Sequence, residues 1–85
     1  MNRFIAEEWC RALRSGKYRR IRYQFSDGEG GFCPLGVLHA MFPKATASHF
    51  ERPETPAVIM DLNDNVAYQT FEGVADFIER NWQRL

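Results

Sequence analysis

The sequence predicts an α+β fold in which three helices pack on a small antiparallel sheet of two or three strands. Three observations predict it: helical repeats of apolar residues near both ends, a stretch of alternating apolar and basic residues after the first repeat, and turn-forming residues between the segments. The 85 residues suffice for one domain, residues 1–85. A composition that is 45% hydrophobic and 14% aromatic argues against disorder.

The first helix is expected from Arg3 to Ser15. Asn2 is a favourable N-cap, and Gly16 is a natural terminator after the last turn. An apolar stripe repeats at helical spacing and comprises Ile5, Trp9, Ala12 and Leu13.

A strand is expected from Arg19 to Phe25, because apolar and polar residues alternate there. The side chains expected on the core face are Ile21, Tyr23 and Phe25, and those expected on the solvent face are Arg20, Arg22 and Gln24. Residues 26–31 contain three glycines and predict a connecting turn.

The second helix is expected after Cys33, which would cap it, with Pro34 at its first position. This segment is apolar on most sides as far as Phe42, as a buried central helix should be. Residues 43–56 contain three of the four prolines and predict a long loop with one helical turn.

Ala57 to Met60 is a short apolar run that predicts a second strand, and residues 61–65 predict a turn. Val66 to Gln69 is a candidate third strand. Thr70 is expected to cap a final helix from Phe71 to Trp82, because apolar residues repeat there at helical spacing.

The net charge is zero, but its distribution along the chain is uneven. Residues 1–25 carry seven basic and two acidic side chains, whereas residues 26–85 carry four basic and nine acidic ones. Arginine and tyrosine are enriched among interface anchors, so the basic segment is the expected partner-binding region. Its candidate residues are Arg11, Arg14, Lys17, Tyr18, Arg19, Arg20 and Arg22.

No apolar run approaches the roughly 20 residues of a membrane helix, and no signal peptide opens the chain. We therefore expect a cytoplasmic protein, monomeric or homodimeric, with no membrane association and with both cysteines reduced. Neither cysteine has a close Cys or His partner at zinc-site spacing, so we expect no metal and no cofactor.

Two alternatives remain open. The first is a nucleic-acid-binding module that uses the face with Arg20 and Arg22, although no helix-turn-helix, zinc-finger or RNP motif accompanies it. The second is a thiol enzyme centred on Cys33, with His39 or His49 as its base. A nucleophile, a base and an orienting group must all be present for such chemistry, and no orienting residue is evident.

Three stretches resemble one family of small, uncharacterised phage and prophage proteins. Residues 9–18 (WCRALRSGKY) are similar to its W..ALRSGKY opening, and residues 31–38 (GFCPLGVL) to its YCCLGVLC centre. Residues 62–64 (LND) and 70–79 (TFEGVADFIE) are similar to its LND…SFEEIADFIE close. Pro34, His39 and Gly73 depart from the pattern.

The resemblance implies a fold and a source but no catalytic residues. We therefore expect a non-catalytic accessory protein of phage type that binds a host protein or nucleoprotein complex. One expected outcome of such binding is inhibition of a host defence system such as a CRISPR effector, an analogy with other small phage proteins.

Overall fold

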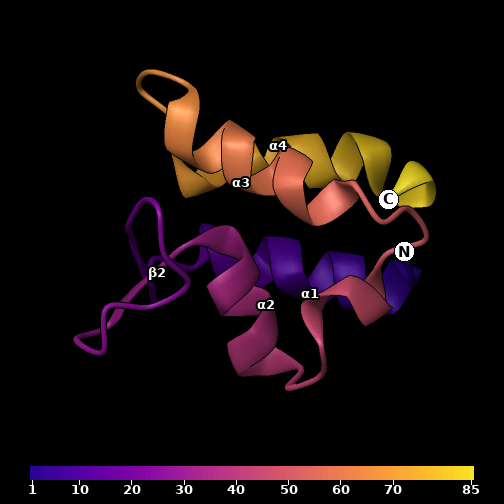
Figure 1. The fold of residues 1–85 in the computed structure, drawn as a ribbon, viewed down its shortest axis with the longest axis horizontal. Coiled ribbons are helices and arrows are strands. Elements are labelled where there is room, and N and C mark those ends of the chain that lie inside the picture. Colours follow the sequence, from indigo (N-terminus) through magenta and orange to yellow (C-terminus); the bar gives the residue numbers. More distant parts are fainter.

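The computed structural model describes all 85 residues and contains four α-helices and one two-stranded sheet (Figure 1). In chain order the elements are α1 (Arg3–Arg14), β1 (Arg19–Arg20), β2 (Gly31–Phe32), α2 (Pro34–Met41), the 3-10 helix η1 (Thr46–His49), α3 (Thr55–Asn65), α4 (Phe71–Asn81) and the 3-10 helix η2 (Trp82–Arg84). Figure 1 shows α3 and α4 along one side, α1 and α2 along the other, and the sheet at one end.

The first helix confirms the predicted caps. The Asn2 side chain accepts a hydrogen bond from the Ile5 amide at 3.1 Å, and Gly16 follows the last turn with φ 77°. The buried face of α1 comprises Ala6, Trp9, Cys10 and Leu13. This face packs mainly against α4, so the two ends of the chain build one interface.

The last helix is also confirmed, including its cap. The Thr70 hydroxyl accepts a hydrogen bond from the Gly73 amide at 3.0 Å. The buried side chains of α4 are Phe71, Val74, Ala75 and Ile78. The Cys10 thiol donates to the Ala75 carbonyl at 3.4 Å and thereby joins α1 to α4.

The central helix α2 is buried over most of its length, as the sequence predicts. The Cys33 sulfur accepts a hydrogen bond from the Gly36 amide at 3.4 Å and Pro34 occupies the first turn, so Cys33 is the N-cap. Gly36 lies against the backbone of the 21–30 loop. A Cβ at this position would lie 2.0 Å from the Phe25 carbonyl oxygen, so only glycine allows this approach.

The predicted antiparallel sheet is wrong. β1 and β2 pair in parallel, with Arg19 opposite Gly31 and Arg20 opposite Phe32, and a single antiparallel bridge joins Ser26 to Phe32. The expected strand from Arg19 to Phe25 ends after Arg20, because Tyr23 takes φ 66° and interrupts the extended backbone. Alternation of side chains holds only along extended backbone.

The predicted strand at Ala57–Met60 is also wrong, because these residues lie within α3. The buried residues Thr55, Ile59 and Asn63 recur every four positions, which is a helical spacing. Residues 61–65 form the last turns of this helix rather than a separate turn, and Val66–Gln69 is a connection, not a third strand. The fold therefore has four α-helices instead of three.

Fifteen buried hydrophobic residues from α1, α2, α3, α4 and both termini form one core cluster. Trp9, its largest side chain, is fully buried, and the indole N–H donates to the Pro34 carbonyl at 2.8 Å. None of the helices combines the length and the apolar character that crossing a bilayer requires.

Candidate functional site

Two tyrosines have a backbone conformation that is uncommon outside glycine. Tyr23 has φ 66° and Tyr68 has φ 60°, and no other non-glycine residue of the chain has a positive φ. Both side chains are exposed, by 71% and 97% respectively. Strained residues of this kind concentrate at functional sites, and aromatic side chains held out in water gain most from contact with a partner.

The two tyrosines lie at the same end of the molecule. The Tyr23 amide donates to Asp64 Oδ1 at 3.0 Å and its hydroxyl donates to the Asp64 carbonyl at 3.3 Å, while Tyr68 follows Asp64 by only four residues. Figure 1 shows the 21–30 loop and the α3–α4 connection projecting at this end. We name this surface the aromatic end; it comprises Tyr23, Phe25, Val66 and Tyr68, all exposed.

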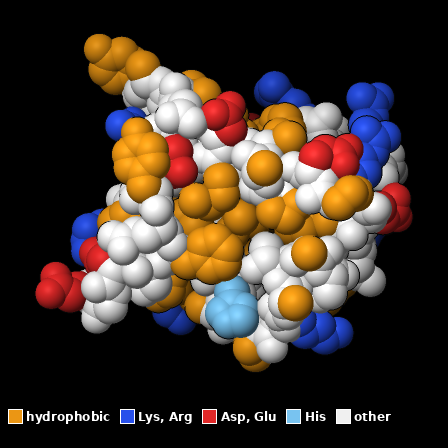
Figure 2. Space-filling model, viewed as in Figure 1, with side chains coloured by type: hydrophobic (Ala, Val, Ile, Leu, Met, Phe, Trp, Pro, Cys, Tyr) orange, Lys and Arg blue, Asp and Glu red, His pale blue; other side chains and the backbone are white.

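Hydrophobic side chains stand out from the surface at this end in the space-filling view (Figure 2). Phe25 is 44% exposed and Val66 is 42% exposed, so the tyrosines have apolar neighbours in the sequence that also reach solvent. Isolated apolar residues on a surface are ordinary, whereas a contiguous group of them marks an interaction site.

A buried polar pair fixes the aromatic end to α3. Asn63 is fully buried and its amide group donates to the Ile21 carbonyl and to Asp64 Oδ1, both at 2.9 Å. Arg20 Nη1 in turn donates to the Asn63 carbonyl at 2.8 Å and to Asn63 Oδ1 at 3.1 Å. Segment 20–23 is therefore held on the last turn of α3 by side chains that are themselves buried, which preorganises the surface.

Most of the predicted partner-binding arginines are engaged within the chain. Arg14 forms ion pairs with three carboxylates of α4: Glu72 at 3.5 Å, Asp76 at 2.7 Å and Glu79 at 2.8 Å. The pKa of Arg14 is raised by its hydrogen bonds to Asp76 and Glu79. Arg11 pairs with Glu8, and Arg19 pairs with Asp27 at 2.6 Å.

The remaining predicted residues divide between two places. Lys17 lies 5.5 Å from the Tyr18 ring centroid, and Tyr18 packs edge-on against Phe32 with centroids 5.2 Å apart. Arg20 and Arg22 form no ion pair and lie beside Tyr23 in the chain, at the aromatic end. Arg20 and Arg22 thus precede Tyr23 at this end, whereas Arg14 is held in ion pairs with α4.

The alternating pattern places Tyr23 and Phe25 in the core, so it does not predict their exposure. A positive φ at Tyr23 has no signature in the sequence. The sequence does contain a signal for the exposure of Tyr68, because this residue closely follows the turn-forming residues Asp64 and Asn65 in the chain.

The residues of the thiol alternative do not come together. Cys33 is fully buried, burial raises the pKa of its thiol, and its sulfur accepts from the Gly36 amide. His39 Nδ1 contacts the Lys44 carbonyl, and His49 Nε2 contacts the Phe42 carbonyl, so neither imidazole is paired with a thiol. A nucleophilic cysteine needs an accessible thiolate, which this arrangement does not provide.

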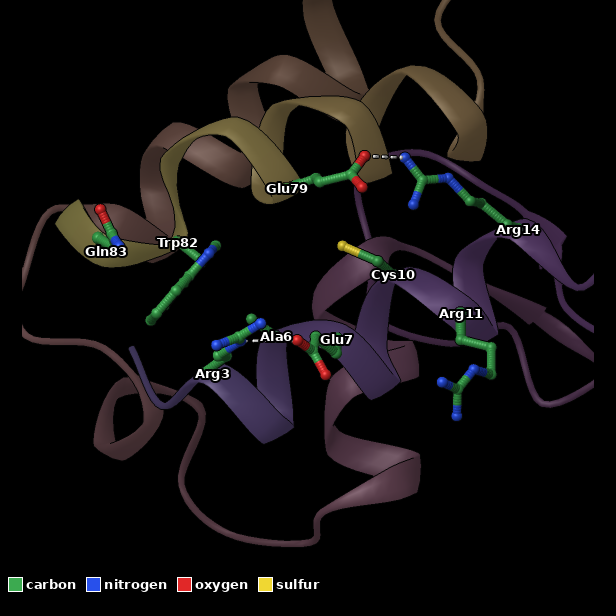
Figure 3. A pocket seen from close by; sticks show the side chains of 9 residues that line it. All are labelled: Arg3, Ala6, Glu7, Cys10, Arg11, Arg14, Glu79, Trp82 and Gln83. Atoms are coloured by element: carbon green, nitrogen blue, oxygen red, sulfur yellow. Dashed lines mark hydrogen bonds and ion pairs between the residues drawn. The ribbon is translucent and has the colours of Figure 1, made fainter.

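A groove of about 710 Å³ runs between α1 and the α4–η2 segment (Figure 3). Its charged side chains are all in ion pairs: Arg3 with Glu7 at 2.8 Å, Arg14 with Glu79 at 2.8 Å, and Arg11 with Glu8. Cys10 lies between the two helices, and burial raises the pKa of its thiol to about 11. The groove therefore presents neither a free charge nor a reactive sulfur. No group of three or more His, Cys, Asp or Glu is placed to hold a metal ion.

Residues 1–57 match the family model described as a domain of unknown function, DUF8296. The chain belongs to this family. The matched region runs from α1 into the first turn of α3, so it contains Tyr23 and Phe25 but not Asp64 or Tyr68. No curated protein and no solved structure matches the chain.

The aromatic end of this DUF8296 protein contains residues from the matched region, 1–57, and residues that follow it. Tyr23 and Phe25 come from the matched region, whereas Asn63 and Asp64, which hold the Tyr23 segment, follow it. The surface is thus a property of the whole folded chain and not of the matched region alone.

Proposed function

We propose that this DUF8296 protein is a non-catalytic binding protein that engages another protein through its aromatic end. The observation that carries the proposal is the pair of exposed tyrosines, Tyr23 and Tyr68, each held at a positive φ at one end of the fold. Holding such residues costs of order 1–3 kcal/mol each, a cost that persists only where the surrounding structure enforces it.

The residue types fit this role. Tyrosine and arginine are enriched among the few side chains that supply most interface energy. The aromatic end contains Tyr23 and Tyr68, and Arg22 directly precedes Tyr23 in the chain. The Asn63–Asp64 contacts keep segment 20–23 in place before binding. Preorganisation reduces the entropy lost on association.

The resemblance to phage proteins supplies the finer part of the proposal. The partner is a host protein complex, binding occurs in the host cytoplasm, and inhibition of a defence system such as a CRISPR effector is one outcome. The two free, buried cysteines suit a reducing compartment.

The test compares capture of host-lysate proteins by three immobilised forms of the chain. The proposal expects the wild-type protein and a Phe4→Ser control to retain the same specific partner, and a Tyr23→Ser/Tyr68→Ser variant to lose it. Phe4 is a matched control because it is 63% exposed and lies on α1. Equal capture by the double variant would refute the proposed surface.

The nucleic-acid alternative has few cations left for phosphate contacts. With Arg11, Arg14 and Arg19 in ion pairs, the basic segment offers Lys17, Arg20 and Arg22. Affinity for a polyanion grows with the number of phosphates neutralised, so three cations favour weak, strongly salt-sensitive binding. A mobility shift at low salt that disappears in Arg22→Gln would favour this alternative.

A further inference from the structure

Arg20 and Arg22 differ from the other arginines of the basic segment in what they contact. Arg20 makes both of its hydrogen bonds through Nη1, and both acceptors are neutral oxygens of Asn63. Its Nε and Nη2 groups donate no hydrogen bond, and Arg22 makes no hydrogen bond or ion pair through its side chain. By contrast, Arg14 and Arg19 each reach a carboxylate within 2.7 Å.

Arg20 is half-buried, and no carboxylate lies within ion-pair distance of it or of Arg22. The pKa of Arg20 is lowered first by burial and next by the charge of Arg22, while the nearby charge of Asp64 acts in the opposite direction. A carboxylate supplied from outside could accept from the Nε and Nη2 groups of Arg20, which donate no hydrogen bond within the chain. A guanidinium binds carboxylates through paired N–H groups, which makes such a contact directional as well as strong.

The apolar half of the surface adjoins these arginines along the chain. Tyr23 follows Arg22 in the chain, and its amide and hydroxyl both bond to Asp64, four residues before Tyr68. A ligand that places a carboxylate at Arg20 and Arg22 would therefore bring its neighbouring side chains against exposed aromatic rings.

Building on the protein-binding function proposed above, we propose that the partner presents an acidic segment to the aromatic end. An aspartate or glutamate of that segment pairs with Arg20 and Arg22, and apolar side chains next to it pack on Tyr23 and Tyr68. The occupant is a short stretch of another protein in which acidic and apolar residues adjoin.

A protein segment fits this surface better than a nucleic acid. A phosphate backbone requires a continuous track of cations, but Arg14 is occupied by three α4 carboxylates and Arg19 by Asp27. The free cations are few. One or two carboxylates match their number.

The test selects ligands without assuming a partner. Random linear peptides displayed on yeast are enriched for binding to the full chain and then counter-screened against Tyr23→Ser/Tyr68→Ser. Surviving peptides are measured against Arg22→Gln and against Arg80→Gln, a control for loss of one exposed, unpaired arginine on α4. Circular dichroism verifies that each variant remains folded, and a fluorescent single-stranded oligothymidine is titrated in parallel.

The expected result is a set of peptides in which Asp or Glu adjoins apolar residues. These peptides should bind Arg22→Gln about fivefold more weakly and Arg80→Gln unchanged. If the enriched peptides depend on the tyrosines but contain no acidic residues, the proposal of an acidic partner segment is refuted, whereas the proposed protein-binding function is not. If no enriched peptide depends on the tyrosines, both proposals fail. Binding of oligothymidine that is lost in Arg22→Gln would then identify a nucleic acid as the partner.

Discussion

Replacing Asp64 with alanine tests whether the buried polar pair holds the aromatic end. Asp64 Oδ1 accepts from the Tyr23 amide at 3.0 Å and from the Asn63 side chain at 2.9 Å, and the residue is only 8% exposed. A hydrogen bond to a charged acceptor contributes about 1.5–3 kcal/mol, and its loss leaves a donor unsatisfied. Because Asp64→Ala removes two such bonds and water can replace part of them, we expect a cost of about 3 kcal/mol.

The assay is urea unfolding, with thermal unfolding as a second measure. A loss of about 3 kcal/mol corresponds to a fall in Tm of about 12–24 °C for a domain of this size. Asp64→Asn retains an oxygen at Oδ1 and should lose less than half as much. Asp61→Ala is the control, because Asp61 is exposed and accepts only from Asn65. If Asp64→Ala cost no more than Asp61→Ala, the Asn63–Asp64 pair would not hold the loop.

Gly36→Ala should destabilise the chain by about 1–3 kcal/mol, measured by urea unfolding, because the new Cβ would meet the Phe25 carbonyl; an unchanged midpoint would contradict the close approach. In an NMR titration the pKa of the Asp27 carboxyl should be about 2, lowered by the Glu29 amide and the Arg19 guanidinium. Its stabilising contribution is present above the ordinary pKa near 4 and is lost as the pH falls toward 2, so a midpoint near 4 would refute these contacts. Alkylation of Cys10 in the native protein should be at least about 100-fold slower than in urea, since the thiol is buried and its pKa is about 11; equal rates would show an open α1–α4 interface.

The helices α1, α2 and α4 could be predicted because their signals are local. Asn2, Cys33 and Thr70 each cap the helix that follows, and each cap is visible in the sequence as a suitable residue before an apolar stretch. Local chemistry and tertiary packing agree in these three elements, so reading the sequence alone finds them.

Helix α3 could not be distinguished from a strand in the same way. The run from Ala57 to Met60 is too short for periodicity to separate the two, and the residues that make the helical repeat include the polar Thr55 and Asn63. Asn63 is buried because it satisfies the backbone of segment 20–23, a contact between residues more than forty positions apart. Such a partner cannot be inferred from spacing.

The candidate site was predicted in part, by its arginines but not by its aromatic residues. Arg20 and Arg22 were expected at a surface, and they lie next to Tyr23 in the chain. Arg14 instead forms ion pairs with carboxylates of α4, a helix far from it in the sequence. Tyr23 was assigned to the core because the alternation assumes continuous extended backbone, which its φ of 66° breaks.

The interface between α1 and α4 has a consequence for synthesis of the protein. During translation Trp9 and its neighbours on α1 emerge well before α4, the helix that covers much of their face, which begins only at Phe71. The nascent chain therefore exposes the apolar face of α1 until α4 has been made. Folding is expected to follow release of the final helix, and a messenger RNA truncated within α3 would yield an aggregation-prone product.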